Sequence, residues 1–182
     1  MRQEIEVKAK VSNLQAVEEK LLERGCIFSE PLIQKDITFA NVDDKEYDSL
    51  VAGLNILRIR NQNGKYIFTV KQTGINDLDC LERETEISDP HEMEQALILM
   101  GFHEAVRINK VRRKTNLDGY EICLDQVENL GYFVEVEKIT KNEDPEKVQA
   151  ELFEFLKQFG VTEGDRVMDG YDTQIYRLQS KK

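Results

Sequence analysis

Pairs of like charges, two residues apart, constrain this chain more than any other feature of its sequence. They occur in segments with the alternation of β-strands, in which successive side chains point to opposite faces. The five pairs are Glu4/Glu6, Arg58/Arg60, Glu84/Glu86, Lys110/Arg112 and Glu135/Glu137. The residue inside each pair is Ile, Val or Thr, so each segment has one charged face and one largely apolar face.

A strand face of this kind has two explanations. Polar residues that alternate with apolar ones usually face solvent. Like charges on one strand face repel each other, however, unless opposite charges lie between them. Acidic strands beside basic strands around a closed lumen would supply such partners, as would a ligand that combines metal and phosphate. We therefore favour a lumen. The first strand, 4–8, with two carboxylates beside Lys8, favours a divalent metal that carries a phosphate.

The order of the segments predicts an antiparallel sheet with few helices. Asn-Gly at 63–64 and Asp-Gly at 118–119 are typical of hairpin turns. Asp89-Pro90 and Asp144-Pro145 are typical helix starts. No glycine-rich phosphate loop with alternating strands and helices occurs, which argues against Rossmann and P-loop folds. We predict an α+β fold, a closed eight-stranded antiparallel β-barrel (a tunnel) with four helices packed on its outside.

Composition sets limits on the function. The 182 residues suit one domain, 1–182, and the net charge of −10 argues against nucleic acid as a partner. A metal ion can still reverse the local potential for a polyanionic small molecule. Three dispersed cysteines indicate neither a disulfide framework nor a zinc motif, and no apolar run suits a membrane span of about 20 residues. We expect a cytoplasmic protein with no membrane partner. The only histidines, His91 and His103, are expected at the surface.

A family resemblance rests on these same residues. Residues 4–8, Glu-Ile-Glu-Val-Lys, resemble the Glu-x-Glu-x-Lys signature of the CYTH superfamily, the triphosphate tunnel metalloenzymes. The other charged pairs and Lys71 follow in the order that this family shows. The segment 124–137 and Tyr171 near the end resemble the class IV adenylyl cyclase branch. The resemblance spans almost the whole chain and implies a closed tunnel that binds a triphosphate.

The resemblance also implies roles for named residues. Phosphate contacts would come from six bases: Lys8, Arg58, Arg60, Lys71, Lys110 and Arg112. Four of them, Lys8, Lys71, Lys110 and Arg112, are expected to act in catalysis as well. Ligands to Mg²⁺ or Mn²⁺ would come from seven acids: Glu4, Glu6, Glu84, Glu86, Asp125, Glu135 and Glu137. Hard oxygen ligands suit these ions, and guanidinium groups suit phosphate. Because a basic lumen repels itself, we expect loss of Arg58 or Arg60 to stabilise the ligand-free protein.

Three functions remain open from the sequence. The first is a class IV-type adenylyl cyclase that converts ATP to cyclic AMP and pyrophosphate. The second is a triphosphatase for inorganic triphosphate, thiamine triphosphate or a nucleotide, and the third is a non-catalytic polyphosphate-binding module. The resemblance of the segment 124–137 favours the cyclase, although one scaffold can host several chemistries. The expected partner is a small-molecule triphosphate such as ATP, and a homodimer is left open.

Overall fold

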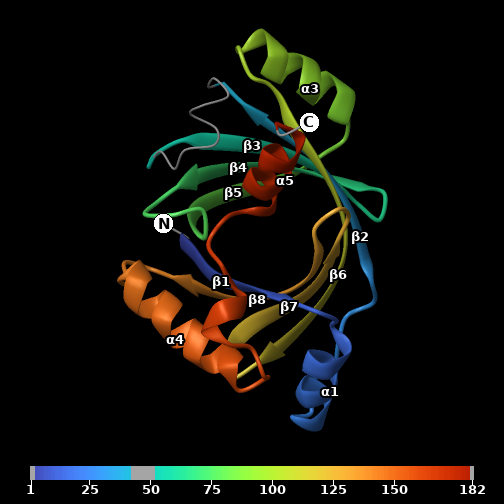
Figure 1. Ribbon diagram of the computed structural model, residues 1–182. Coiled ribbons are helices and arrows are strands. Elements are labelled where there is room, and N and C mark those ends of the chain that lie inside the picture. The colour runs from blue at the N-terminus through green and yellow to red at the C-terminus, as the bar shows by residue number, and fades with distance from the viewer. Residues whose placement is uncertain (1–2, 42–51, 181–182) are drawn as a thin grey trace.

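A computed structural model, which describes residues 3–41 and 52–180, shows a β-barrel with helices around it (Figure 1). The strands are β1 Gln3–Val11, β2 Leu32–Ala40, β3 Asn55–Gln62, β4 Lys65–Thr73, β5 Asp79–Ile87, β6 His103–Leu117, β7 Tyr120–Val127, β8 Gly131–Thr140 and β9 Arg166–Val167. The α-helices are α1 Gln15–Glu23, α3 Pro90–Leu99, α4 Pro145–Lys157 and α5 Tyr171–Gln179. An acidic loop around Asp43, Asp44 and Glu46, expected from the sequence to be mobile, lies outside the described residues.

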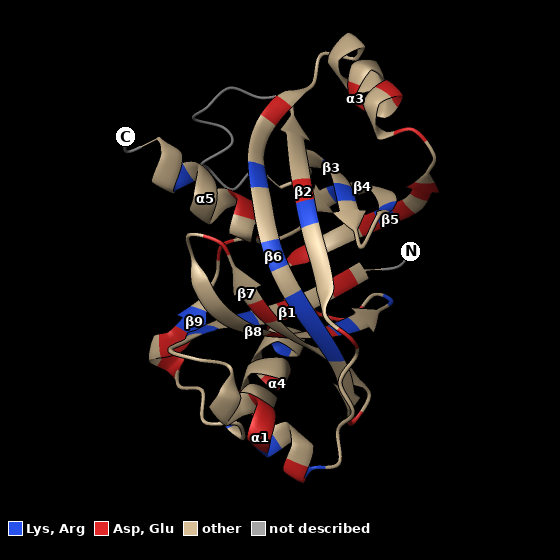
Figure 2. Ribbon diagram, turned by 90° about the vertical axis from the view of Figure 1, so that its right-hand side faces the viewer, with Lys and Arg blue, Asp and Glu red and all other residues tan. Residues whose placement is uncertain are grey.

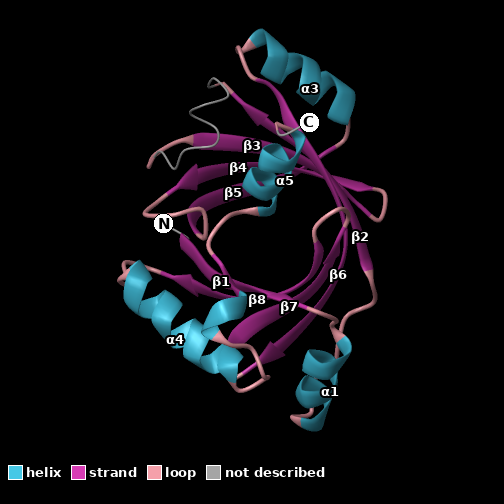
Figure 3. Cartoon of the chain, in the orientation of Figure 1, coloured by secondary structure: helices cyan, strands magenta, loops and turns pink. Residues whose placement is uncertain are grey.

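The strands form a closed antiparallel barrel, which confirms the predicted fold (Figure 3). The sheet order is β5-β4-β3-β2-β6-β7-β8-β1, and β1 returns to pair with β5. This closing seam is short: Gln3, Glu4 and Ile5 pair with Leu81, Cys80 and Asp79. Farther along β1, the two-residue strand β9 pairs with Lys8 and Ala9. The sequence did not predict β9, because two residues are too few to show a period.

Both hairpin turns form where the sequence predicts them. Asn63 and Gly64 have φ angles of 50° and 88°, and Asp118 and Gly119 have 54° and 87°. Positive φ at both central residues is the requirement of a type I′ turn, which matches the right-handed twist of the flanking strands. The turns therefore fix the registers of β3 with β4 and of β6 with β7.

The outer face of the barrel carries the hydrophobic core. Helices α1 and α4 cover β1, β7 and β8, where Ile5, Val7, Ile122, Val134 and Val136 pack against Leu21, Leu152 and Leu156. On the opposite side, Leu97 of α3 packs against Phe39, Leu57 and Ile59 of β2 and β3. Burial of this outer face commits the alternate, charged residues to the inside. Among the described residues, no helix combines the length and apolar character that a membrane crossing requires.

Helix α5 lies across one mouth of the barrel (Figure 1). Its first turn is capped from the β4–β5 loop, because the Asp77 carboxylate accepts hydrogen bonds from Gly170 N at 3.1 Å and from Thr173 Oγ1 at 2.9 Å. Ile175 and Tyr171 of this helix pack with apolar residues of β6 and β8. The cap and this packing hold the first residue of α5, Tyr171, inside the lumen.

Candidate functional site

The inner face of the barrel encloses a cavity of about 380 Å³ lined by ionisable side chains. Figure 2 shows basic positions spaced along β6. Eleven of the predicted site residues line this cavity: Glu4, Glu6, Lys8, Arg58, Arg60, Lys71, Glu84, Lys110, Arg112, Glu135 and Glu137. Asp125 lies beneath them, with no exposed surface. The structure does not bring Glu86 into the cavity, since its side chain is 73% exposed and lies 3.8 Å from Lys65 Nζ.

The first of two ion-pair groups, here called the Asp125 cluster, consists of Lys8, Lys110, Arg112, Asp125 and Glu135. Arg112 contacts both carboxylates, and its Nε donates to Asp125 Oδ1 at 2.7 Å. Lys110 Nζ lies 3.1 Å from Asp125, and Lys8 Nζ lies 3.2 Å from Glu135. Burial opposes ionisation of Glu135, but Arg112 and Lys8 hold its pKa well below the usual value. The cluster therefore holds its charges ionised inside the protein.

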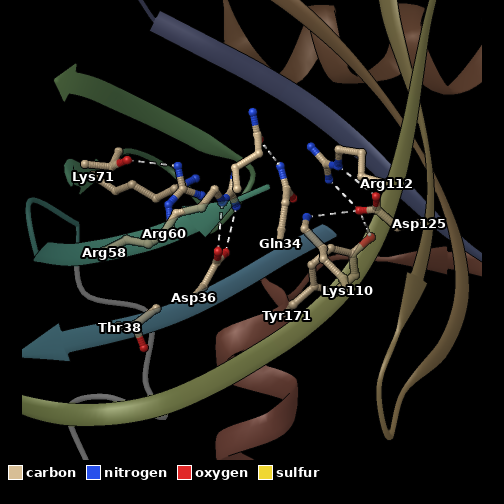
Figure 4. A network of polar contacts seen from close by, with 12 residues as sticks. Gln34, Asp36, Thr38, Arg58, Arg60, Lys71, Lys110, Arg112, Asp125 and Tyr171 are labelled. Atoms are coloured by element: carbon tan, nitrogen blue, oxygen red, sulfur yellow. Dashed lines mark hydrogen bonds and ion pairs between the residues drawn. The ribbon is translucent and has the colours of Figure 1, made fainter. Parts of the chain in front are cut away.

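Tyr171 covers this cluster from α5 (Figure 4). Its hydroxyl donates to Asp125 Oδ2 at 3.0 Å, and its ring centroid lies 3.9 Å from Lys8 Nζ and 4.8 Å from Lys110 Nζ. Cations over an aromatic face are stabilised by the ring quadrupole. Burial, together with Arg112, lowers the pKa of Lys110 to about 8. Lys110 is thus mainly protonated at neutral pH and can serve as a cation.

The second group, the Asp36 cluster, consists of Asp36, Arg58, Arg60, Lys71, Glu82 and Glu84 on β2 to β5. Arg60 makes a bidentate pair with Asp36 at 2.8 and 2.7 Å (Figure 4). Arg58 donates to Glu84 at 2.9 Å and to Thr69 at 3.0 Å, and Lys71 pairs with Glu82. Burial favours the neutral form of Glu82, but Lys71 and Arg58 lower its pKa to about 2. These bases are therefore held in the lumen by carboxylates.

A row of carboxylates crosses three neighbouring strands. Glu6, Glu137 and Glu121 are successive partners across β1, β8 and β7. One potential metal-ligating atom from each of Glu121, Cys123 and Glu137 lies within 4.8 Å of the others. Glu4 lines the cavity together with Glu6 and Glu137. Burial is the largest cause that raises the pKa of Glu137 to about 8, and the negative charges of Glu121, Glu6 and Glu4 add to it. Hard oxygen donors at mutually repulsive positions fit Mg²⁺ or Mn²⁺, because a divalent cation would remove the repulsion.

The other predicted metal ligands are engaged by bases. Asp125 and Glu135 belong to the Asp125 cluster, and Glu84 accepts from Arg58. Among residues 3–41 and 52–180, by contrast, Glu137 forms no ion pair. Glu6 and Glu121 also have basic neighbours, Lys8 at 3.6 Å and Lys114. The acidic row of Glu4, Glu6, Glu121 and Glu137 is the part of the barrel best suited to a metal because Glu137 at its centre lies opposite two other carboxylates.

Acids outnumber bases along the cavity wall. Among residues 3–41 and 52–180, nine carboxylates line it (Glu4, Glu6, Asp36, Asp77, Glu82, Glu84, Glu135, Glu137 and Asp172), against seven bases (Lys8, Arg58, Arg60, Lys71, Lys110, Arg112 and Lys114). These acids weaken the attraction of the wall for a highly charged anion, which is drawn chiefly to the bases of the two ion-pair groups. A divalent cation on the acidic row would reverse that balance.

The sequence did not identify several residues of the barrel interior as site residues. Asp36 and Gln34 lie in β2, whose inner face continues the alternation, but a single acid gives no paired-charge signal. Glu82 alternates with Glu84 and Glu86 on one strand face but lies outside their pair, and the structure buries it in place of Glu86. Glu121 shares its strand face with Cys123 and Asp125, yet its role appears only when β7 pairs with β8.

Together, the fold and the lumen define a class of protein: an antiparallel β-barrel tunnel with interleaved acids and bases inside. Comparison with known families agrees with this description, since the CYTH domain matches residues 2–171. The chain belongs to the CYTH domain family.

Individual relatives cover nearly the whole chain. A protein of Methanocaldococcus jannaschii, provisionally named an adenylate cyclase, is 31% identical over 171 residues, which are 92% of this chain and 95% of that one. A solved Pyrococcus horikoshii structure is 28% identical with a TM-score of 0.78, covering 98% of this chain and 99% of the other. A Hippeastrum structure, 20% identical with a TM-score of 0.64 over 98% and 96% of the two chains, shows the same fold. It is described as a provisional adenylyl cyclase with dominant triphosphatase activity.

Proposed function

We propose that this protein is a divalent-metal-dependent enzyme that acts on a triphosphate inside the barrel, as a class IV-type adenylyl cyclase. The observation that carries the proposal is the placement of Glu4, Glu6 and Glu137 beside the six bases of the two ion-pair groups in one cavity of about 380 Å³. A metal-bound triphosphate has the complementary charges. The name of the M. jannaschii relative supports cyclisation of ATP.

The bases would bind the phosphates. Arg58, Arg60, Lys71, Lys110 and Arg112 come from three different strands and all line the cavity. Because carboxylates already hold their side chains in the lumen, less side-chain entropy is lost when phosphate oxygens bind. The arginines offer forked, charge-assisted hydrogen bonds, which are worth about 1.5–3 kcal/mol each.

The acidic row would hold the metal through Glu4, Glu6 and Glu137, with Glu121 beside them. When bound, Mg²⁺ or Mn²⁺ supplies a Lewis acid that neutralises phosphate charge and lowers the pKa of a nearby hydroxyl. Lys8 connects the Asp125 cluster, of which it is a member, to this row, since its Nζ is 3.6 Å from Glu6 and 3.2 Å from Glu135. It would therefore keep a positive charge next to the bound triphosphate.

Cyclisation requires attack of the ATP 3′-hydroxyl on the α-phosphorus, with pyrophosphate as the leaving group. In this lumen, the basic clusters would stabilise the negative charge that develops on the pyrophosphate. Tyr171 and α5 would limit the entry of water at one mouth, which favours the internal hydroxyl over hydrolysis. No new protein group has to move into place for this role, because Tyr171 already lies inside the cavity.

A triphosphatase is the second candidate, and the description of the Hippeastrum structure favours it. It would use the same bases and acids, with water attacking the terminal phosphorus. The two reactions differ in which phosphorus is attacked.

Product analysis tests the proposal. The purified protein is incubated with ATP or inorganic triphosphate and Mg²⁺ or Mn²⁺, and the products are separated by chromatography. Cyclic AMP with pyrophosphate supports the cyclase, and phosphate release supports the triphosphatase. Binding without turnover would leave a polyphosphate-binding module and reject both enzymes. Glu137→Gln should remove the activity, whereas Glu128→Gln, on the exposed β7–β8 turn, serves as a matched control.

A further inference from the structure

Two neutral amides lie between the charged clusters of the lumen. Gln34 on β2 and Gln62 on β3 are directly opposed in the ladder, and Gln34 Nε2 donates to Gln62 Oε1 at 2.6 Å. Both side chains line the cavity, and Gln34 is only 1% exposed. Figure 4 shows Gln34 between the Asp36 and Asp125 clusters. Neither amide can replace a charge on a phosphate or a metal, so the ionic chemistry of the site does not explain them.

The amide pair has unused hydrogen-bonding capacity. Gln34 Oε1 is buried and has no hydrogen-bond partner within residues 3–41 and 52–180. Over the same ranges, Gln62 makes no side-chain hydrogen bond other than the one it accepts from Gln34, which leaves its Nε2 as a donor. A buried unsatisfied oxygen destabilises a protein, and in native structures such an atom calls for a partner. The pair therefore offers one acceptor beside one donor.

The surroundings of the pair suit a planar group attached to phosphate. Leu32 precedes Gln34 on the inner face of β2, and Ile67 of β4 lies opposite Arg60, two residues before Gln62. These apolar side chains flank the amides on the inner wall of the barrel. Lys110 pairs directly with Gln34 across β2 and β6, so a phosphate-binding cation lies beside the amides. A nucleobase has the matching features: apolar faces, a polar edge and a phosphate chain.

We propose that Gln34 and Gln62 read the edge of the base of a nucleoside triphosphate. Gln34 Oε1 accepts a hydrogen bond from an exocyclic amine, and Gln62 Nε2 donates one to the adjacent ring nitrogen. Adenine carries this arrangement, and glutamine amides recognise it elsewhere. The inference rests on the proposed function and narrows it, because inorganic triphosphate has no such edge.

Calorimetric titration with matched ligands tests the proposal. The probes are non-hydrolysable bismethylene analogues of ATP and of purine riboside triphosphate, which lacks the amine, and the imido analogue of inorganic triphosphate, all with Mg²⁺. The parent protein should bind the ATP analogue about tenfold more tightly than the purine analogue. Gln34→Met and Gln62→Met should abolish this preference and leave the affinity for the imido triphosphate unchanged.

Controls separate recognition from folding. Gln126→Met makes the same change at an exposed position on the outside of β7 and should keep the tenfold preference. Thermal melting checks that Gln34→Met folds, and Gln62→Met, at a half-exposed position, provides the second variant. Equal loss of affinity for all three probes, or no preference in the parent, would overturn the inference while leaving triphosphate binding intact. A parent that binds none of the probes would reject the proposed function together with it.

Discussion

Glu6 and Glu137 lie directly opposite each other across β1 and β8, with Glu121 next in line on β7. Opposed like charges on neighbouring strands destabilise a sheet, typically by a few tenths to about 1 kcal/mol per pair. Burial and these neighbours raise the pKa of Glu137 to about 8. The arrangement is consequently unfavourable in the ligand-free protein and favourable when a divalent cation lies between the carboxylates.

Removing one carboxylate should have opposite effects on stability and activity. Glu137→Gln should stabilise the metal-free protein by about 1 kcal/mol, because this buried carboxyl group lies opposite Glu6 and Glu121. Glu6→Gln also removes the ion pair with Lys8, so the stability should change little. Both changes should reduce turnover on the order of 10²-fold or more, because a metal ligand is lost. Thermal melts with and without Mg²⁺ or Mn²⁺, and product assays, provide both readouts. Full turnover of the parent in excess chelator would refute the metal requirement.

Arg60→Ala should destabilise the protein, contrary to the expectation from sequence that losing this arginine relieves repulsion. The structure pairs Arg60 with Asp36, a carboxylate that is only 4% exposed. Loss of one member of a buried pair costs about 3–5 kcal/mol. Asp36→Asn in the same background should restore part of that loss. Arg58→Ala should cost less, because Glu84 is half exposed and its other partner, the buried Glu82, keeps its closer pair with Lys71.

Both arginine variants should bind triphosphate much more weakly than the parent, with a smaller loss for monophosphate. Lys at either position should recover charge but only part of the affinity. Calorimetric titration with the non-hydrolysable ATP analogue measures this effect. Near-normal triphosphate affinity in Arg58→Ala would show that the arginine is only structural.

Glu82 should govern part of the acid stability. Lys71 and Arg58 overcome its burial and lower its pKa from 4.5 to about 2. A carboxyl group whose pKa falls on folding stabilises the native state above its unfolded pKa, and this contribution disappears as the pH falls from about 4.5 to 2. The contribution at neutral pH is on the order of 3 kcal/mol. Urea unfolding from pH 7 to 2 should show a loss of stability that is smaller by about this amount in Glu82→Gln than in the parent, because other carboxyl groups with lowered pKa, such as Glu135, still contribute. Glu86→Gln, on the same face of β5 but exposed, should leave the pH dependence unchanged.

Asp77→Ala should loosen α5 without unfolding the barrel. The lost carboxylate accepts from Gly170 N and Thr173 Oγ1 in the first turn of the helix. Removal of a capping side chain costs about 0.5–2 kcal/mol. Hydrogen exchange should accelerate in 171–179 and remain unchanged in β7. Equal acceleration in both segments would indicate a global effect and contradict a local capping role.

The barrel and its charged inner face could be predicted because their signals are local. Alternation of side chains with a period of two can be recognised within a single strand such as 4–8. The turns at Asn63-Gly64 and Asp118-Gly119 can likewise be recognised without knowledge of any distant residue. The partners of each charge could not be predicted in this way. Arg60 meets Asp36 because of the stagger between β2 and β3, and that register is set by the whole barrel.

The same distinction between local signals and long-range contacts applies to the site residues. The paired charges identified nine residues of the cavity wall. Gln34 and Asp36 carry no such pair, and Glu82 precedes the pair Glu84/Glu86, so these three residues were assigned no role in the site. Glu86 has the same pattern as Glu84, yet it lies past the end of the cavity at the tip of β5. The capping contact joins Asp77 in the β4–β5 loop to Gly170, which lies 93 residues later in the chain. A local sequence pattern does not reveal a contact over this separation.

The short seam between β1 and β5 affects how the chain folds while it is being synthesised on the ribosome. β1 pairs along its length with β8, from Gln3 with Thr140 to Val11 with Tyr132, and only three of its residues pair with β5. A nascent chain must therefore carry β1 with an open edge while β2 to β7 are synthesised. Such long-range pairing is slow, and open strand edges invite association with other chains. Nascent chains that stop before β8 should need chaperone protection, whereas chains that extend past Thr140 should close.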